Sequence, residues 1–336
     1  MNTDTKTRLS ATVLEIQRMS TEDGPGLRTT VFLKGCSLKC KWCHNPESIS
    51  KKPQLQWIGN RCIGCMTCIE TCPNGCLEFR EAGLNINRDI CEGCGKCAVA
   101  CPSTALELMG TNWELEDLIK EVAKDKAYFD KSDGGVTVSG GEPALQPKFV
   151  RAFLKGLKEI GIQTAIDTCG MCSSSALEEI LPYATMVLFD LKDIDPVKHQ
   201  EFTGGDLDKI LNNLLLIRDT IRTHVHPKTL WIRTPIIPGT TDRHENIRGI
   251  GKYLADHLGN TVNRWELCSF NNLCRDKYLR LGLNWEYKDS ELMTKAEMEA
   301  LLSTARKSGL NPESIMWSGS TRLEEETGSR NEKNIV

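Results

Sequence analysis

Three groups of closely spaced cysteines constrain this chain more than any other feature. Eleven of its sixteen cysteines fall in these groups, at spacings of two or three residues, before residue 102. Such spacing is typical of thiolates that converge on one metal centre, whereas disulfide frameworks rarely place cysteines so close together. We therefore predict metal clusters rather than disulfides, in a reducing compartment.

Composition narrows the class of protein further. The 336 residues, 40% of them hydrophobic, suit one sizeable domain with a small insertion. A net charge of −3, from 42 basic and 45 acidic residues, gives no electrostatic reason to expect a nucleic-acid or membrane partner. Residues 1–10 lack a signal-peptide run, and no stretch approaches the roughly 20 apolar residues of a membrane span. We expect a cytoplasmic protein.

The first cysteine group has the pattern C-x3-C-x2-C, formed by Cys36, Cys40 and Cys43. Three thiolates can hold three irons of a 4Fe–4S cube and leave the fourth iron open to a ligand that is not protein. An open position distinguishes a catalytic metal from a structural one. The alternative is a zinc site with His44 as fourth ligand. It is disfavoured because His44 directly follows Cys43, so both could not easily reach one tetrahedral ion.

The second and third groups repeat one pattern, C-x2-C-x2-C-x3-C-P, which is typical of bacterial two-cluster ferredoxins. In that arrangement the fourth cysteine of each run binds the other cluster, so neither cube has an open iron, and both suit electron storage or relay. Zinc ribbons are the alternative, and the repeated fourth Cys plus Pro disfavours them. The predicted ligand sets are Cys62, Cys65, Cys68 and Cys101 for one cube, and Cys72, Cys91, Cys94 and Cys97 for the other.

Five cysteines remain outside these sets. Cys169 and Cys172 form a C-x2-C pair, but no second pair lies nearby in the sequence, so packing is favoured over metal binding. Cys76 is interpreted as a small core residue. The two others are Cys268 and Cys274.

Beyond residue 112 the sequence alternates between strand and helix patterns, which predicts βα units and a parallel sheet. Helical spacing covers 113–130, 148–159, 174–181, 207–221, 245–258 and 295–308. Strands are expected at 136–139, 164–168, 186–191, 230–237 and 265–270, after an earlier one at 29–33.

Polar motifs follow four of these strands in succession. They are Ser139–Gly140–Gly141–Glu142–Pro143, Asp167–Thr168, Asp190–Leu191–Lys192, and Arg233 with Pro238–Gly239. Any one alone could be turn chemistry. Because the carboxyl ends of parallel strands meet at one edge of a sheet, four together predict a site there.

These motifs, with the Asp23–Gly24–Pro25–Gly26 and Cys43–His44–Asn45–Pro46 elements, resemble the glycyl radical enzyme activating enzymes of the radical S-adenosylmethionine (SAM) superfamily. The likeness runs from about residue 12 to about residue 317 and fits the subtype with an inserted ferredoxin domain. It implies an α/β fold: a partial (β/α)6 barrel over 1–54 and 109–317, and a two-cluster insert over 55–108. Residues 318–336 are expected to be a disordered tail.

The resemblance also implies residue roles. The open iron would bind SAM, with Trp42 near the adenine. Asp23 would lie near the substrate glycine loop. The remaining SAM residues would be Gly140, Gly141 and Glu142 at the amino group, Lys192 and Arg233 at the carboxylate, and Asp167, Thr168 and Asp190 around a monovalent cation. Asn271 is a departure, since the family often has His there; asparagine can hydrogen-bond but carries no charge.

The implied activity is reductive cleavage of SAM to methionine and a 5′-deoxyadenosyl radical, which takes a hydrogen from a glycine of a partner glycyl radical enzyme. The implied cofactors are three 4Fe–4S clusters and SAM, with flavodoxin or ferredoxin as electron donor and an anaerobic setting. Three alternatives stay open: a radical SAM enzyme acting on a small molecule or peptide, a multi-cluster electron-transfer protein, and a zinc-binding interaction module.

Overall fold

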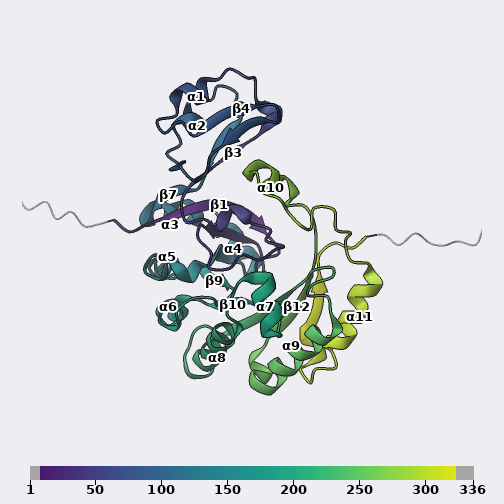
Figure 1. The fold of residues 1–336 in the computed structure, drawn as a ribbon. Coiled ribbons are helices and arrows are strands. Elements are labelled where there is room, and N and C mark those ends of the chain that lie inside the picture. The colour runs from purple at the N-terminus through teal and green to yellow at the C-terminus, as the bar shows by residue number, and fades with distance from the viewer. Residues whose placement is uncertain (1–7, 323–336) are drawn as a thin grey trace, which may run out of the picture.

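The computed structural model describes residues 8–322, which form one large sheet and a small protruding unit (Figure 1). In the described part the large sheet has nine strands in the order β13-β12-β11-β10-β9-β8-β2-β1-β7. Their bounds are β1 Ser10–Ser20, β2 Arg28–Leu33, β7 Thr111–Glu114, β8 Gly135–Gly140, β9 Gln163–Thr168, β10 Met186–Asp190, β11 Thr229–Ile236, β12 Arg264–Ser269 and β13 Ile315–Ser318.

Strands β2, β8, β9, β10, β11, β12 and β13, which are neighbours in this order in the sheet, all run parallel. Strands β1 and β7 are antiparallel to their neighbours. The sheet is curved and open, with edges at β7 and β13, and helices cover its outer face (Figure 1). Side chains such as Phe153, Leu214 and Trp265 fill the core between these layers. The predicted α/β partial barrel is confirmed.

Helices connect the parallel strands, as the alternating pattern predicted. They are α3 Leu115–Ala123, α4 Lys126–Ser132, α5 Pro147–Glu159, α6 Ser174–Ile180, α7 Pro196–Thr203, α8 Leu207–Thr223, α9 His244–His257, α10 Arg275–Leu281 and α11 Lys295–Ala305.

The single helix predicted over 113–130 is wrong. Its start belongs to β7, because residues 111–114 pair with Ser10–Val13 of β1. The rest divides into α3 and α4 around Asp125, whose buried carboxylate accepts a hydrogen bond from Thr29 Oγ1 at 2.7 Å. A tertiary contact therefore breaks a pattern that local spacing alone would continue.

The protruding unit lies in the connection between β2 and β8. It contains two small sheets, β3 Gln54–Trp57 with β6 Leu106–Met109 and β4 Leu77–Arg80 with β5 Gly83–Ile86, and helices α1 Thr67–Thr71 and α2 Lys96–Ala100. Gln54 pairs with Met109, so the chain enters and leaves the unit side by side. Its apolar side chains form a core of their own, and α10 lies beside β3 (Figure 1).

Most of the predicted tail, residues 323–336, lies outside the described residues. The first residues of the predicted tail, 318–322, are described, and they contact the sheet and the segment before α11. Ser320 O accepts a hydrogen bond from Ser269 Oγ at 2.9 Å, and Arg322 N donates one to Met293 O at 2.9 Å. Within residues 8–322, no helix is both long and apolar enough to cross a membrane.

Candidate active site

A cavity of about 600 Å³ lies where the parallel strands end, at the edge predicted from their polar motifs. Nearly every predicted residue of the catalytic site lines it, although these residues span more than 200 positions of the chain. Those residues are Asp23, Cys36, Cys40, Trp42, Cys43, Gly140, Gly141, Asp167, Thr168, Asp190, Lys192 and Arg233.

Main-chain contacts on two sides fix the loop that carries the three cysteines. At the end of α7, Lys39 N donates to Thr203 O at 2.8 Å and Lys41 N donates to Phe202 O at 3.0 Å. From the other side, Trp285 Nε1 donates to Lys41 O at 3.1 Å and Tyr278 Oη donates to Cys43 O at 2.8 Å. Backbone held in this way gives the three side chains defined positions, as a ligand loop requires.

The chemistry of this donor set fits an iron–sulfur cube. Burial raises the pKa of the Cys40 thiol to about 11 and raises that of Cys43 as well, so these thiols need an adjacent positive centre to ionise. In the described part of the chain, no three His, Cys, Asp or Glu side chains converge closely enough to hold a single metal ion. A cube takes each thiolate on a different iron and does not need that convergence.

Two glycines let the turn after β8 pack against the cysteine loop. A Cβ atom on Gly140, whose φ is +109°, would lie 2.3 Å from Leu33 N, and one on Gly141 would lie 2.1 Å from Gly35 O. Both distances are far below van der Waals contact, so only glycine fits this close backbone approach.

Glu142 is the one predicted SAM residue that does not line the cavity. Its buried carboxylate accepts hydrogen bonds from Thr168 Oγ1 at 2.8 Å, Cys169 N at 2.9 Å and Ala144 N at 3.0 Å. These bonds join the turn after β8 to the end of β9. A direct contact between Glu142 and SAM stays a prediction.

Two pairs of oppositely charged side chains line the cavity. Lys192 Nζ lies 2.7 Å from Asp190 Oδ2, and Arg233 Nη1 lies 3.5 Å from Asp167 Oδ2, which also accepts from Ser139 Oγ at 2.8 Å. Burial raises the pKa of Asp167 to about 7 despite the nearby Arg233. Its other oxygen, Oδ1, is buried without a partner within the described residues, so it is available to a bound cation or polar ligand.

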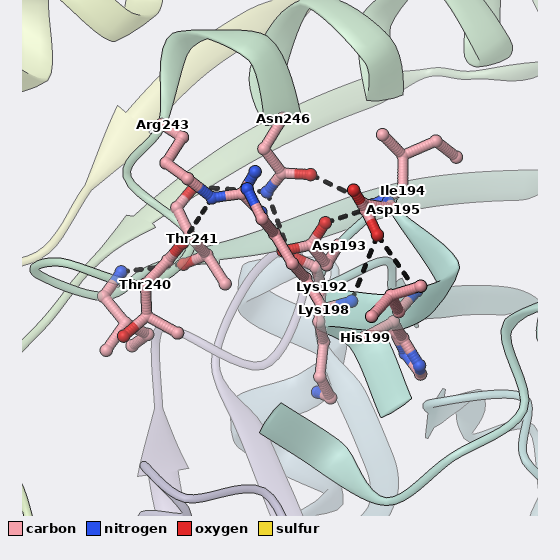
Figure 2. A network of polar contacts seen from close by, with 12 residues as sticks. Lys192, Asp193, Ile194, Asp195, Lys198, His199, Thr240, Thr241, Arg243 and Asn246 are labelled. Atoms are coloured by element: carbon pink, nitrogen blue, oxygen red, sulfur yellow. Dashed lines mark hydrogen bonds and ion pairs between the residues drawn. The ribbon is translucent and has the colours of Figure 1, made fainter. Parts of the chain in front are cut away.

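A second layer of polar contacts holds the backbone around Lys192 (Figure 2). Asn246 Nδ2 donates to Lys192 O at 3.3 Å and to Thr241 O at 3.1 Å, while its Oδ1 accepts from Ile194 N at 3.0 Å. Beside it, the fully buried Asp193 pairs with Arg243. The position of the Lys192 ammonium therefore depends on residues outside the cavity.

Several residues of the cavity wall were not predicted as site residues. Gln17, Ser20 and Glu22 come from β1 and the turn after it, and Ser20 Oγ donates to Asp23 Oδ2 at 2.7 Å. Alternation along β1 could have indicated that strand, but nothing in the sequence places its end at the cavity. Asn271, noted for its departure from the family, also lines the cavity, as do His44 and Ser269.

The surplus cysteines divide between core and cavity. Cys172 is buried in an apolar cluster, as predicted for a packing role, and Cys274, for which no role was predicted, is buried in another. Cys169 and Cys268 line the cavity, and the Cys169 thiol lies 3.0 Å from Glu142 Oε2. The interpretation of Cys169 as packing alone is therefore incomplete.

In the protruding unit, the four cysteines of one predicted ligand set line a single pocket. A small pocket is lined by Cys62, Cys65, Cys68 and Cys101 together, which fits a cube held by those four thiolates. Cys72, Cys91 and Cys97 pack in the apolar core of the unit. Cys94 is exposed.

Comparison with known proteins indicates the superfamily of this chain. Family models match at residues 92–248, described as the radical SAM superfamily, and at residues 61–105, described as a 4Fe-4S dicluster domain. A solved radical SAM methyltransferase from Sphaerobacter thermophilus shares the fold at a TM-score of 0.51 and 11% identity, covering 91% of this chain and 76% of that one. The fold is thus that of a radical SAM protein.

Curated relatives narrow the class further. The chain is 38% identical to the (2S)-3-sulfopropanediol dehydratase activating enzyme of Klebsiella oxytoca, over 82% of this chain and 87% of that one. It is 36% identical to the indoleacetate decarboxylase activating enzyme of Tractidigestivibacter scatoligenes, over 90% and 96%. The benzylsuccinate synthase activating enzyme of Thauera aromatica also matches at 36%, over 88% and 89%.

The chain belongs to the glycyl radical enzyme activating enzymes, in the group with an inserted dicluster ferredoxin domain. Its function is the radical SAM activation of a partner glycyl radical enzyme.

Proposed function

We propose that Cys36, Cys40 and Cys43 hold the catalytic 4Fe–4S cube and that SAM occupies the cavity beside them. The single observation that carries this assignment is the cavity itself, which brings these three thiols together with two glycines and both charge pairs at one strand edge. When bound, the cube supplies the electron that cleaves SAM, giving methionine and a 5′-deoxyadenosyl radical that takes a hydrogen from the partner's glycine.

The charged residues of the cavity suit the charges of SAM. Lys192 and Arg233 offer donors for its carboxylate, and the unpartnered oxygen of Asp167 offers an acceptor for its amino group or for a monovalent cation. Trp42, packed edge-on against Phe202 at 6.4 Å between ring centroids, offers an aromatic edge for the adenine. Thr168 and Asp190 would complete the cation site.

The protein's second task is to direct the radical. A radical of this kind removes hydrogen from the nearest C–H bond, so the wall opposite SAM must admit only the intended glycine. Asp23 is held for such a role, because its Oδ2 accepts from both Ser20 Oγ and Thr30 Oγ1 at 2.7 Å. We propose that the glycine loop enters beside Asp23, where the open sheet leaves room for a protein substrate.

We propose that the insert, residues 55–108, holds two further 4Fe–4S cubes with the crossed ligand sets predicted above. Each set supplies four thiolates and no open iron, which suits transfer of electrons from an external donor such as flavodoxin or ferredoxin. Sixteen cysteines suit the reducing, anaerobic cytoplasm, where we place the protein.

The test is anaerobic reconstitution with iron and sulfide, followed by reduction with dithionite in the presence of SAM. We expect about twelve irons per chain and formation of 5′-deoxyadenosine. A Cys36→Ala, Cys40→Ala, Cys43→Ala variant should keep about eight irons and form none. Full iron content without SAM cleavage would contradict the radical mechanism and favour an electron-transfer protein. Zinc in place of iron would contradict both of these functions.

A further inference from the structure

Cys76 breaks the internal symmetry of the insert. The two cysteine runs end in matching hexapeptides, Cys72–Pro73–Asn74–Gly75–Cys76–Leu77 and Cys101–Pro102–Ser103–Thr104–Ala105–Leu106. Cys76 thus occupies the position that Ala105 occupies in the other half, and both side chains are buried. A methyl group satisfies the packing at one of the two sites, so packing does not require a thiol at the other.

The Cys76 thiol lies against sulfur. Its Sγ is 3.2 Å from Cys72 Sγ, and the Cys76 backbone N–H donates to the same sulfur at 3.4 Å. Cys91 packs in the same apolar cluster as Cys76. Both neighbours belong to one predicted ligand set, that of the second auxiliary cube.

The corresponding sulfur in the other half has a different and more distant side-chain donor. Cys101 Sγ has the Ser103 hydroxyl at 3.7 Å, and the side chain at position 105 carries no donor. The two predicted ligand sets therefore differ in the side-chain donor next to one sulfur, a thiol at 3.2 Å in one half and a hydroxyl at 3.7 Å in the other, although their ligand spacing is the same.

Cys76 is not needed as a ligand, because the crossed sets already give each cube four thiolates. A thiol that binds no iron keeps its proton and acts as an S–H donor. Reduction of a cube adds one electron, part of which resides on the ligand sulfurs. A donor at the sulfur stabilises that added charge, so it raises the reduction potential.

We propose that the Cys76 S–H donates to the Cys72 sulfur and makes the cube of Cys72, Cys91, Cys94 and Cys97 the more easily reduced of the two. This inference rests on the cluster assignment of the proposed function. The difference in reduction potential sets the direction of electron transfer within the insert. An electron that enters either cube transfers to this cube before it leaves the insert. The step is a one-electron exchange between cubes, with no proton transferred.

The test is a redox titration of the insert clusters, followed by electron paramagnetic resonance. The full chain carrying Cys36→Ala, Cys40→Ala and Cys43→Ala leaves only the two insert cubes to contribute. In this background Cys76→Ala should make one cube about tenfold harder to reduce, a downward shift of about 59 mV for one electron. Cys76→Ser keeps a donor of similar size and should restore part of the shift.

The internal repeat supplies a matched control. Ala105→Cys places a thiol at the equivalent position and should raise the potential of the other cube, leaving the first unchanged. Iron is counted in every variant. Unchanged potentials with about eight irons retained would overturn the inference while leaving the cluster assignment intact. Loss of about four irons in Cys76→Ala would make Cys76 a ligand and overturn it as well. Absence of iron from the insert of the parent chain would overturn the assignment itself.

Discussion

Arg88 of the insert donates a hydrogen bond from Nε to the carbonyl oxygen of Leu281 at 2.8 Å. Leu281 ends α10, and the same helix carries Tyr278, whose hydroxyl donates to Cys43 O. Lys277, also on α10, pairs with the buried Glu47 at 2.7 Å, just beyond the cysteine loop. One short helix therefore touches both the insert and the loop that carries Cys36, Cys40 and Cys43.

Tyr278→Phe should remove the hydrogen bond to Cys43 while keeping the ring stacked on Trp285, where the centroids are 5.1 Å apart. We expect the free energy of unfolding to fall by about 1 kcal/mol, because a carbonyl oxygen loses its partner. Anaerobic urea denaturation measures the change. Tyr253→Phe is the control, since no hydrogen bond of the Tyr253 hydroxyl occurs within residues 8–322; equal losses in both variants would contradict this role for Tyr278.

Arg243→Ala should be far more destabilising. Asp193 is fully buried and pairs with Arg243, so the variant leaves an uncompensated carboxylate in the interior. We expect a loss of about 3–5 kcal/mol and weaker SAM binding, because Lys192 is adjacent. Lys252→Ala, which breaks the exposed pair with Asp256, should cost under about 1 kcal/mol. Similar denaturation midpoints for the two variants would rule out this account.

Gly141→Ala should push the turn after β8 away from the cysteine loop. The added Cβ would lie 2.1 Å from Gly35 O and 3.0 Å from Cys36 N. We expect destabilisation of about 1–3 kcal/mol and loss of about four irons per chain. Gly161→Ala is the comparison, because its φ is +74° but nothing lies within 4 Å of the new atom. It should cost about 1–2 kcal/mol of strain and keep full iron.

Acid should destabilise the protein through His199. Burial lowers the pKa of this imidazole, whose Nδ1–H donates to Gly205 O at 3.0 Å. The folded state therefore stays neutral while the unfolded state takes up a proton below about pH 6.5. The contribution of neutral His199 to the free energy of unfolding is therefore present in full above that pH. It is lost as the pH falls towards the pKa of His199 in the folded state. Unfolding free energies measured from pH 5 to 8 should depend less on pH in His199→Asn; an unchanged slope would exclude His199 as the cause.

The sequence predicted the parallel strands and the polar residues at their ends because both depend on local patterns. It missed α7, although Asp195 before Pro196 is a strong helix-start signal: the Asp195 carboxylate accepts from Val197 N and Lys198 N. The link between Arg88 and Leu281 joins residues 193 positions apart, and no local pattern could indicate it. Nor could spacing show that the Glu142 side chain is engaged by β9, since its neighbours in the chain are typical of a turn.

The pairing of Gln54 with Met109 has a consequence for how such a protein can arise. Because the insert leaves and rejoins the barrel at neighbouring positions, it can be gained or deleted as one continuous segment of gene without re-routing the strands around it. The main cost of deletion would fall on α10, which would lose Arg88 as a partner. A lineage could therefore exchange its dicluster domain while keeping its radical chemistry.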